Sequence, residues 1–213
     1  MKVTSFALGP FAANCLVLEA EGCQDVFLVD PGFDVEQVIL WLERRNKKPC
    51  AVLLTHAHLD HASGCGAVKE SFPEVPVWLH EKDLPLLQNL ATQAHMFGFP
   101  TPPAVTGEPV LKDGLELSLA GERLLVRHCP GHSPGHVVFL GEEGGQPWAV
   151  VGDVIFAGSV GRTDLWGGSW DELEASIRQV IYRLPGDTVL YPGHGPTTTV
   201  GEERLSNPFV SDT

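Results

Sequence analysis

The sequence predicts a layered α/β fold. Short apolar runs with the length and composition of strands alternate with segments whose apolar residues recur at helical spacing. Several of the strand-like runs are followed directly by histidine-bearing polar motifs, and loops beyond strand ends are where functional groups gather in layered α/β folds. At 213 residues the chain can bury a sizeable core, and we expect a single domain over residues 1–213.

The first half of the chain alternates expected strands and helices. Turns rich in Gly, Pro and Asn separate strands at Val3–Leu8, Cys15–Glu19, Val26–Asp30, Ala51–Leu54 and Val75–His80. Helices are expected at Asp34–Arg45, Ala62–Ser71 and Lys82–Ala91. Asp34 is the expected N-cap of the first helix. The segment Thr92–Glu108 is rich in Pro and Gly, which predicts an ordered loop or lid that lines the substrate groove.

The second half is predominantly β. Strands are expected at Leu115–Leu119, Arg123–His128, His136–Leu140 and Trp148–Gly152. A helix is expected at Trp170–Leu184, followed by a strand at Thr188–Tyr191 and a short helix at Gly201–Asn207.

Composition argues against several classes of function. The net charge of −13 argues against nucleic acid as a partner, because phosphate binding needs a basic surface. The five cysteines are an odd number without a C-x-x-C pair, which favours a reducing compartment. The N-terminal residues read as two strands around a turn rather than a signal peptide, and no apolar run has the length of a membrane span. We therefore expect a cytoplasmic protein that does not associate with membranes.

The stretch THAHLDH, residues 55–61, places four candidate metal ligands after a buried strand. His56 and His58 are two residues apart, so in an extended segment both side chains point the same way and can bind one metal ion. Asp60 and His61 follow where the chain turns and can reach a second ion. The ligands still missing are supplied by His132, Asp153 and His194, each beside a Gly or Pro at a strand end. We predict His56, His58 and His132 on one ion, Asp60, His61 and His194 on the other, and Asp153 bridging both.

Such a pair of ions favours hydrolysis. Two ions about 3.5–4 Å apart can hold a hydroxide between them, and that hydroxide can attack an electrophilic carbonyl. Asp60 and Asp153 are the expected catalytic carboxylates. Asp30 is expected to accept a hydrogen bond that braces the histidine-rich loop, and His136 to pack behind the ligands. His80, His95 and His128 are not expected to bind metal, and Cys129 is expected to be a buried, inert thiol.

The motifs THAHLDH, PGHSPGH, GD and PGHG, in this order and spacing, resemble the metallo-β-lactamase superfamily over essentially the whole chain. The resemblance implies a four-layer αβ/βα sandwich with the metal site at one edge, and it carries the family's seven ligands over to the same seven residues. Asp153 stands where many true β-lactamases have cysteine, which argues against a β-lactamase. The segments GDVIFAGSVGRTD and PGHGPTTTVGEERLSNPF resemble short, single-domain glyoxalase II-like hydrolases. This implies cleavage of a small-thiol thioester such as S-lactoylglutathione.

The resemblance leaves alternatives open. Full-length glyoxalase II contacts glutathione through a C-terminal helical domain, which is not expected here. Arg162 is predicted to hold a carboxylate of the thiol, although a salt bridge to Asp164 explains it equally well. The string GRTD is also typical of persulfide dioxygenases, which would use one Fe(II) on His56, His132 and Asp153, whereas PGHG at the last histidine favours the hydrolase.

Three further questions stay open at this point. A non-enzymatic metal-binding or redox-sensing domain is a remote third reading, because structural zinc sites are closed and rich in thiolates. The expected cofactors are two divalent ions, zinc or else iron or manganese, since His and Asp ligands accept all three. The oligomeric state is not predicted.

Overall fold

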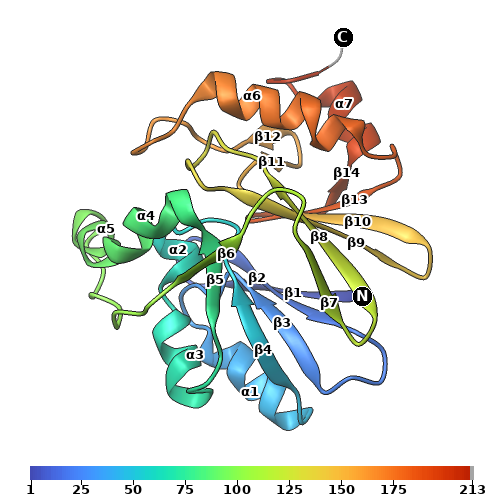
Figure 1. Ribbon diagram of the computed structural model, residues 1–213. Helices are drawn as coiled ribbons and strands as arrows, with labels where there is room; N and C mark the ends of the chain where they lie inside the picture. The colour runs from blue at the N-terminus through green and yellow to red at the C-terminus, as the bar shows by residue number, and fades with distance from the viewer. Residues whose placement is uncertain (212–213) are drawn as a thin grey trace.

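The computed structural model describes residues 1–211 and contains two six-stranded sheets within them (Figure 1). The first sheet has the order β1 (Lys2–Leu8), β2 (Ala13–Glu19), β3 (Asp25–Val29), β4 (Lys48–Leu53), β5 (Val77–His80) and β6 (Glu108–Leu111). The strands from β1 to β3 pair antiparallel, and those from β3 to β6 pair parallel.

The second sheet has the order β14 (Thr198–Thr199), β13 (Val189–Pro192), β10 (Gln146–Gly152), β9 (Val137–Glu143), β8 (Glu122–His128) and β7 (Glu116–Leu119). Its pairs are antiparallel except for β10 with β13. A small hairpin, β11 (Ile155–Phe156) with β12 (Ser159–Val160), follows β10.

Three apolar clusters separate four layers. One lies between the two sheets, and the other two lie between each sheet and the helices outside it. Helices α1 (Glu36–Arg44) and α3 (Cys65–Ser71) cover the first sheet, and α6 (Trp170–Gln179) and α7 (Val200–Ser206) cover the second (Figure 1). The predicted four-layer αβ/βα sandwich is confirmed.

Successive side chains of the central strands point to opposite faces of the sheet, and both faces are covered by apolar clusters. In β3, Phe27 belongs to the cluster between the sheets, whereas Leu28 belongs to the cluster under the helices. In β10, Val150 faces the first sheet and Ala149 faces α6. A strand buried on both faces is a continuous apolar run, and this is how these strands read in the sequence.

Two expected helix starts were wrong. Asp34 does not cap the first helix: its φ is +56°, α1 begins at Glu36, and no side chain caps it. The helix expected at Ala62–Ser71 is divided into α2 (Leu59–Ala62) and α3. The break lies at Gly64, where a Cβ would come 2.2 Å from the carbonyl oxygen of Gly32. The close approach of these two backbones therefore interrupts the helix.

The region around residue 90 also differs from the prediction. The helix expected at Lys82–Ala91 is a short 3₁₀ turn η1 (Glu81–Asp83), then α4 (Leu84–Gln88) and the first residues of α5 (Leu90–Phe97). The predicted loop Thr92–Glu108 is therefore helical up to Phe97. Its prolines all lie beyond Phe99, and Gly98, at a φ of +75°, ends α5 in the left-handed conformation that glycine adopts easily. Strand β6 was not predicted.

The C-terminal elements lie close to their predicted places. Helix α6 ends at Gln179, and a 3₁₀ turn η2 (Ile181–Arg183) continues to the end of the predicted segment. Helix α7 begins with a capping box in which Thr199 and Glu202 bond each other's backbone N–H groups. None of the described helices combines the length and apolar character that crossing a membrane requires.

Candidate metal centre

Loops at one edge of the two sheets carry the predicted ligands. His56 and His58 lie between β4 and α2, and Asp60 and His61 lie in the first turn and a half of α2. The second sheet supplies the rest: His132 lies between β8 and β9, Asp153 follows β10 directly, and His194 follows β13. The structure therefore brings together residues that are up to 138 positions apart in the sequence, counted from His56 to His194.

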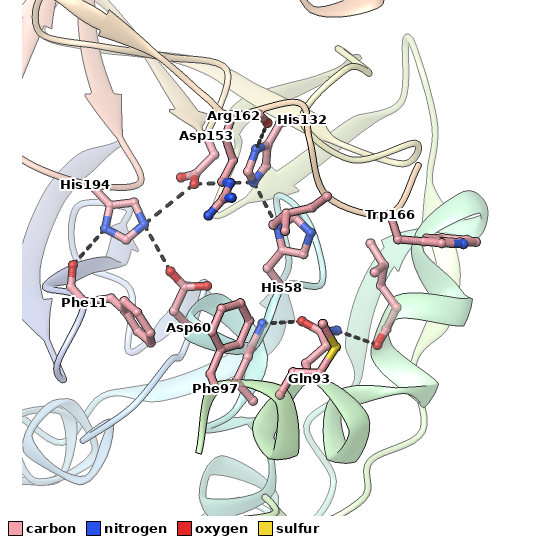
Figure 2. Close-up of a pocket in the computed structure, with 14 residues that line it drawn as sticks. Phe11, His58, Asp60, Gln93, Phe97, His132, Asp153, Arg162, Trp166 and His194 are labelled. Atoms are coloured by element: carbon pink, nitrogen blue, oxygen red, sulfur yellow. Dashed lines mark hydrogen bonds and ion pairs between the residues drawn. The ribbon is translucent and has the colours of Figure 1, made fainter. Parts of the chain in front are cut away.

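The ligands form two groups of three. The ligating atoms of His56, His58 and His132 lie within 4.8 Å of one another, and the same holds for those of Asp60, His61 and His194. Asp153 lies between the groups (Figure 2). Its Oδ2 is 3.4 Å from His132 Nε2, and its Oδ1 is 3.5 Å from His61 Nε2. The structure therefore places all seven predicted residues together, with Asp153 between the two groups.

Hydrogen bonds on the far side of three rings determine which nitrogen faces the centre. His132 Nδ1 donates to the carbonyl of Arg162 (2.7 Å), and His194 Nδ1 donates to the carbonyl of Phe11 (3.0 Å). His61 Nδ1 donates to Asp30 Oδ2 (3.2 Å). Because Nδ1 donates to these acceptors, Nε2 is the nitrogen of each ring that faces the centre.

The ring nitrogens of the two groups converge, which is a test of whether the residues fit a metal ion. His58 Nδ1 lies 2.9 Å from His132 Nε2, and His61 Nε2 lies 3.3 Å from His194 Nε2. Nε2 of His56 and Oδ1 of Asp153 are buried without a hydrogen-bond partner. Buried acceptors without a partner are costly in a protein alone, and a divalent cation at the point where these ring nitrogens converge would satisfy them. The residues fit two metal ions.

Burial keeps the first group of histidines neutral. It lowers the pKa of His58 to about 3, with neighbouring His132 adding to the effect. Burial likewise lowers the pKa of His132 to about 4 and that of His56 well below its usual value. Neutral imidazole is the form that ligates metal, so this group is ready to bind near pH 7.

In the second ligand group, nearby carboxylates have the larger effect on the pKa of His61. Burial alone would lower the pKa of His61, but Asp60, Asp153 and Asp30 outweigh it and raise the pKa to about 10. Burial opposes ionisation of Asp60, yet His61 and His194 hold its pKa well below its usual range. Cationic charge is therefore strongly favoured at this group, whether a proton or a metal ion supplies it.

Asp30 and His136 lie behind the ligands, as expected. Asp30 accepts hydrogen bonds from the Thr55 N–H (2.7 Å) and the Thr55 hydroxyl (2.6 Å) as well as from His61. The His136 ring stacks on His56 with centroids 4.9 Å apart, and its Nε2 accepts from the Asp153 N–H (3.0 Å). Both residues are buried and orient groups of the centre.

Asp83 has a central position that the sequence did not reveal. Its buried carboxylate accepts from the Ala57 N–H (3.1 Å), the Ser133 hydroxyl (2.8 Å) and the Gly135 N–H (2.6 Å). Asp83 thus joins the loop of His56 and His58 to the loop of His132. No local pattern marks it, because its partners, two backbone N–H groups and the Ser133 hydroxyl, lie in distant loops.

A cavity of about 350 Å³ opens over the centre (Figure 2). Metal-group residues His58, Asp60, His132, Asp153 and His194 line one side of it. Phe11, Leu86, Met96, Phe97, Leu165 and Trp166 line the rest, together with Leu59, Gln93 and Arg162. Met96 and Phe97 belong to the segment predicted to line the groove, although they lie on α5 and not in a loop.

Arg162 lies at this cavity with its guanidinium already paired. Its Nε donates to Asp164 Oδ1 (2.6 Å) and its Nη2 to Asp164 Oδ2 (2.8 Å). Both side chains are exposed. The salt bridge that the sequence allowed as an alternative is therefore present, and a substrate carboxylate would compete with Asp164.

The remaining histidines and the candidate thiol lie apart from the centre. His80 and His128 stack on each other with ring centroids 4.2 Å apart, and His95 is exposed on α5. Cys129 is fully buried in the cluster under α6, and burial raises the pKa of its thiol well above the usual range.

Comparison with known proteins agrees with this geometry. The sequence model of the metallo-beta-lactamase superfamily matches residues 8–194. Hydroxyacylglutathione hydrolase GloC of Haemophilus influenzae is 36% identical over 214 residues, which cover 99% of each chain.

Two crystal structures are similar over almost the whole length. TTHA1623 in a di-iron-bound form is 40% identical with a TM-score of 0.85, over 98% of this chain and 100% of that one. BLEG-1 B3 metallo-beta-lactamase is 38% identical with a TM-score of 0.89, over 98% and 99%. The chain belongs to the metallo-β-lactamase superfamily.

Proposed function

We propose that the protein is a metal-dependent hydrolase of a small-thiol thioester, of the S-lactoylglutathione type, with two divalent ions at the centre. The observation that carries the proposal is the pair of three-residue groups with Asp153 between them. Similarity over the full length to a hydroxyacylglutathione hydrolase supports the same reaction.

The chain's own residues account for most of the reaction's requirements. His56, His58 and His132 would hold one ion, Asp60, His61 and His194 the other, and Asp153 both. When bound, such ions lower the pKa of water and polarise a carbonyl oxygen. Asp60 and Asp153 line the cavity, and their carboxylate oxygens can accept hydrogen bonds that orient the attacking water. Attack at the thioester carbon breaks the C–S bond and yields a carboxylate, a thiol and a proton.

Arg162 is the proposed contact for a carboxylate of the thiol. It lines the cavity, and its exposed pair with Asp164 can exchange one carboxylate for another at little cost. If this role holds, Arg162→Ala raises KM for a glutathione thioester more than it lowers kcat, because the contact is remote from the scissile bond.

Persulfide dioxygenase activity with one Fe(II) is a second candidate. The GRTD segment that favours it lies against the centre, because the Arg162 carbonyl accepts the His132 N–H. That reaction would use His56, His132 and Asp153. It leaves Asp60, His61 and His194 without a role, although they form a complete ligand group.

A paired assay separates these reactions. Thioester cleavage and oxygen uptake are measured on S-lactoylglutathione and glutathione persulfide, and a cephalosporin is included because BLEG-1 is a metallo-β-lactamase. We expect thioester cleavage as the main activity. Oxygen uptake with the persulfide and no thioester cleavage would contradict the proposal.

Asp60→Ala tests the second ligand group. We expect thioester kcat/KM to fall at least about a hundredfold and bound metal to fall from two ions towards one, because the variant lacks a ligand. Asp187→Ala, which removes an exposed carboxylate from a turn before β13, serves as the control. Full thioesterase activity and metal content in Asp60→Ala would show that the two-ion arrangement is wrong.

A further inference from the structure

The cavity over the metal centre has an apolar wall opposite the ligands. Six residues from three separate segments form it: Phe11, Leu86, Met96, Phe97, Leu165 and Trp166. Figure 2 shows Phe11, Phe97 and Trp166 around the ligand side chains, each from a different part of the chain.

Much of this wall is exposed to water. Met96 is 72% exposed, Trp166 63% and Phe97 46%. Large apolar side chains that gather at a concave site are typical of ligand-binding surfaces, because a bound apolar group removes them from water. The wall is therefore suited to contact with an apolar part of the substrate.

The part of the wall on α5 and Phe11 is held in place before any substrate arrives. On α5, Gln93 accepts from the Leu59 N–H (2.9 Å) and donates to the carbonyls of Ala57 (3.2 Å) and Leu86 (3.0 Å). These bonds join α5 to the loop that carries His58. Phe11 packs against Phe99, with ring centroids 5.4 Å apart. Preorganisation of this kind lowers the entropy cost of binding.

Charge at the wall is low. Among the described residues that line the cavity, Arg162 alone carries a guanidinium or ammonium group, and it is paired with Asp164. The amide of Gln93 is used by its three hydrogen bonds. A substrate group that lies against this wall therefore meets mainly hydrocarbon, and the indole N–H of Trp166 is the hydrogen-bond donor on it.

From these observations we infer that the substrate's acyl group is bulky and apolar, aromatic or branched, and that it lies against Phe97 and Trp166. The inference rests on the proposed thioester hydrolysis and adds the class of acyl group. A lactoyl group carries only a methyl group on its hydroxylated carbon, so it would leave most of this wall in contact with water.

The test compares two thioesters of glutathione that differ by one substituent. The lactoyl ester is measured beside the mandeloyl ester, in which a phenyl ring replaces the methyl group. Because the thiol and the hydroxyl are the same, the ratio of the two kcat/KM values, divided by the ratio of the two uncatalysed hydrolysis rates, reports contact with the wall. We expect the metal-loaded protein to prefer the mandeloyl ester by roughly tenfold or more.

Two variants locate the preference. Trp166→Ala and Phe97→Ala are each expected to reduce the mandeloyl-to-lactoyl ratio at least about threefold, since each removes part of the apolar contact. Phe209→Ala is the matched control, because Phe209 is 54% exposed but does not line the cavity. Mandelate is also expected to inhibit at lower concentration than lactate, which checks binding without turnover.

The outcomes distinguish this inference from the proposed function. Equal or better cleavage of the lactoyl ester, or a ratio that neither variant changes, would overturn the inference and leave thioester hydrolysis standing. If neither ester is cleaved, the proposed function itself fails and the inference fails with it.

Discussion

At the scale of single residues, the centre depends on which nitrogen of each histidine carries a proton. His61 donates its Nδ1–H to Asp30, while carbonyls of Arg162 and Phe11 accept from His132 and His194. These acceptors hold each ring so that its Nε2 faces the centre. Of the three, only Asp30 is a side chain and can be changed by mutation without moving the backbone.

Asp30→Asn tests this role. The amide replaces one acceptor oxygen with an NH₂ group, so it cannot accept all three hydrogen bonds that Thr55 and His61 donate to Asp30. We expect metal affinity to fall about 10- to 100-fold, measured by competition with a chromophoric chelator. Asp34→Asn is the control, because Asp34 is exposed at a φ of +56°, which Asn tolerates. Unchanged affinity in Asp30→Asn would exclude a role for Asp30 in orienting His61.

The stacked pair of His80 and His128 makes folding sensitive to pH. Burial, with His128 adding to it, lowers the pKa of His80 to about 4, and Nδ1 of the neutral ring accepts from the Lys82 N–H. An unfolded histidine titrates near pH 6.5. Between pH ~6.5 and ~4 the unfolded chain therefore binds more protons at this position, and stability falls as the pH falls.

His80→Asn tests this contribution. Asparagine can still accept the Lys82 N–H as an N-cap but cannot take up the proton. We expect the variant to lose less stability than the wild type between pH 7 and pH 5, by on the order of 1 kcal/mol after allowance for solvent screening. Urea unfolding at both pH values measures this difference in stability. His95→Asn is the control, because His95 is an exposed residue of α5. If the free energy of unfolding of His80→Asn depends on pH as that of the wild type does, His80 does not contribute to the pH dependence.

Residue spacing in the sequence was enough to identify the residues that the structure gathers at the centre. They lie in short motifs at strand ends, and their chemistry restricts their use. Asp83 and Gln93 could not be found in this way. Each acts through hydrogen bonds to the backbone of another loop, and the sequence does not record such contacts.

At the scale of elements, the 3₁₀ turn after β5 joins two loops of the centre. Asp83 in this turn accepts three hydrogen bonds, from Ala57 in one loop and from Ser133 and Gly135 in the other. The first ligand group draws His56 and His58 from one of these loops and His132 from the other. The spacing within that group thus depends on a turn that contributes no ligand.

Asp83→Asn is expected to destabilise the fold by about 2–3 kcal/mol, because a buried N–H donor loses its acceptor. Denaturant unfolding measures the change, and we also expect added metal to stabilise the variant less than the wild type. Asp113→Asn is the control: Asp113 accepts from Arg127 and the His128 N–H but is exposed. A change no larger in Asp83→Asn than in Asp113→Asn would show that the turn does not hold the loops together.

The strands were easier to predict from sequence than the helices around residue 90. A strand buried on both faces is an apolar run of typical length, so β3, β4 and β10 were recognisable. Helix α5 was missed because its water-facing side carries Met96 and Phe97, so its apolar residues do not mark one buried face. The helix that the sequence did not predict forms part of the wall of the cavity. Exposed apolar residues at such a site are expected to serve binding rather than folding.

At the scale of the whole molecule, two sheets face each other so that the ligand loops of both open at one edge. The first sheet supplies His56, His58, Asp60 and His61, and the second supplies His132, Asp153 and His194. Neither sheet alone completes either ligand group. The four-layer arrangement was expected from the resemblance of the motifs to a family, whereas the order of strands within the sheets was not predicted, because single-sequence patterns do not determine which strands pair.

Stepwise metal loading is the most direct measurement of the central claim, a thioester hydrolase that needs two ions. Metal-free protein is titrated with Zn²⁺, and S-lactoylglutathione cleavage is followed after each addition; the mandeloyl ester serves equally if it is the better substrate. The account predicts that activity keeps rising beyond one equivalent and reaches its plateau at two. A plateau at one equivalent, or no thioester cleavage at any loading with zinc, iron or manganese, would contradict it.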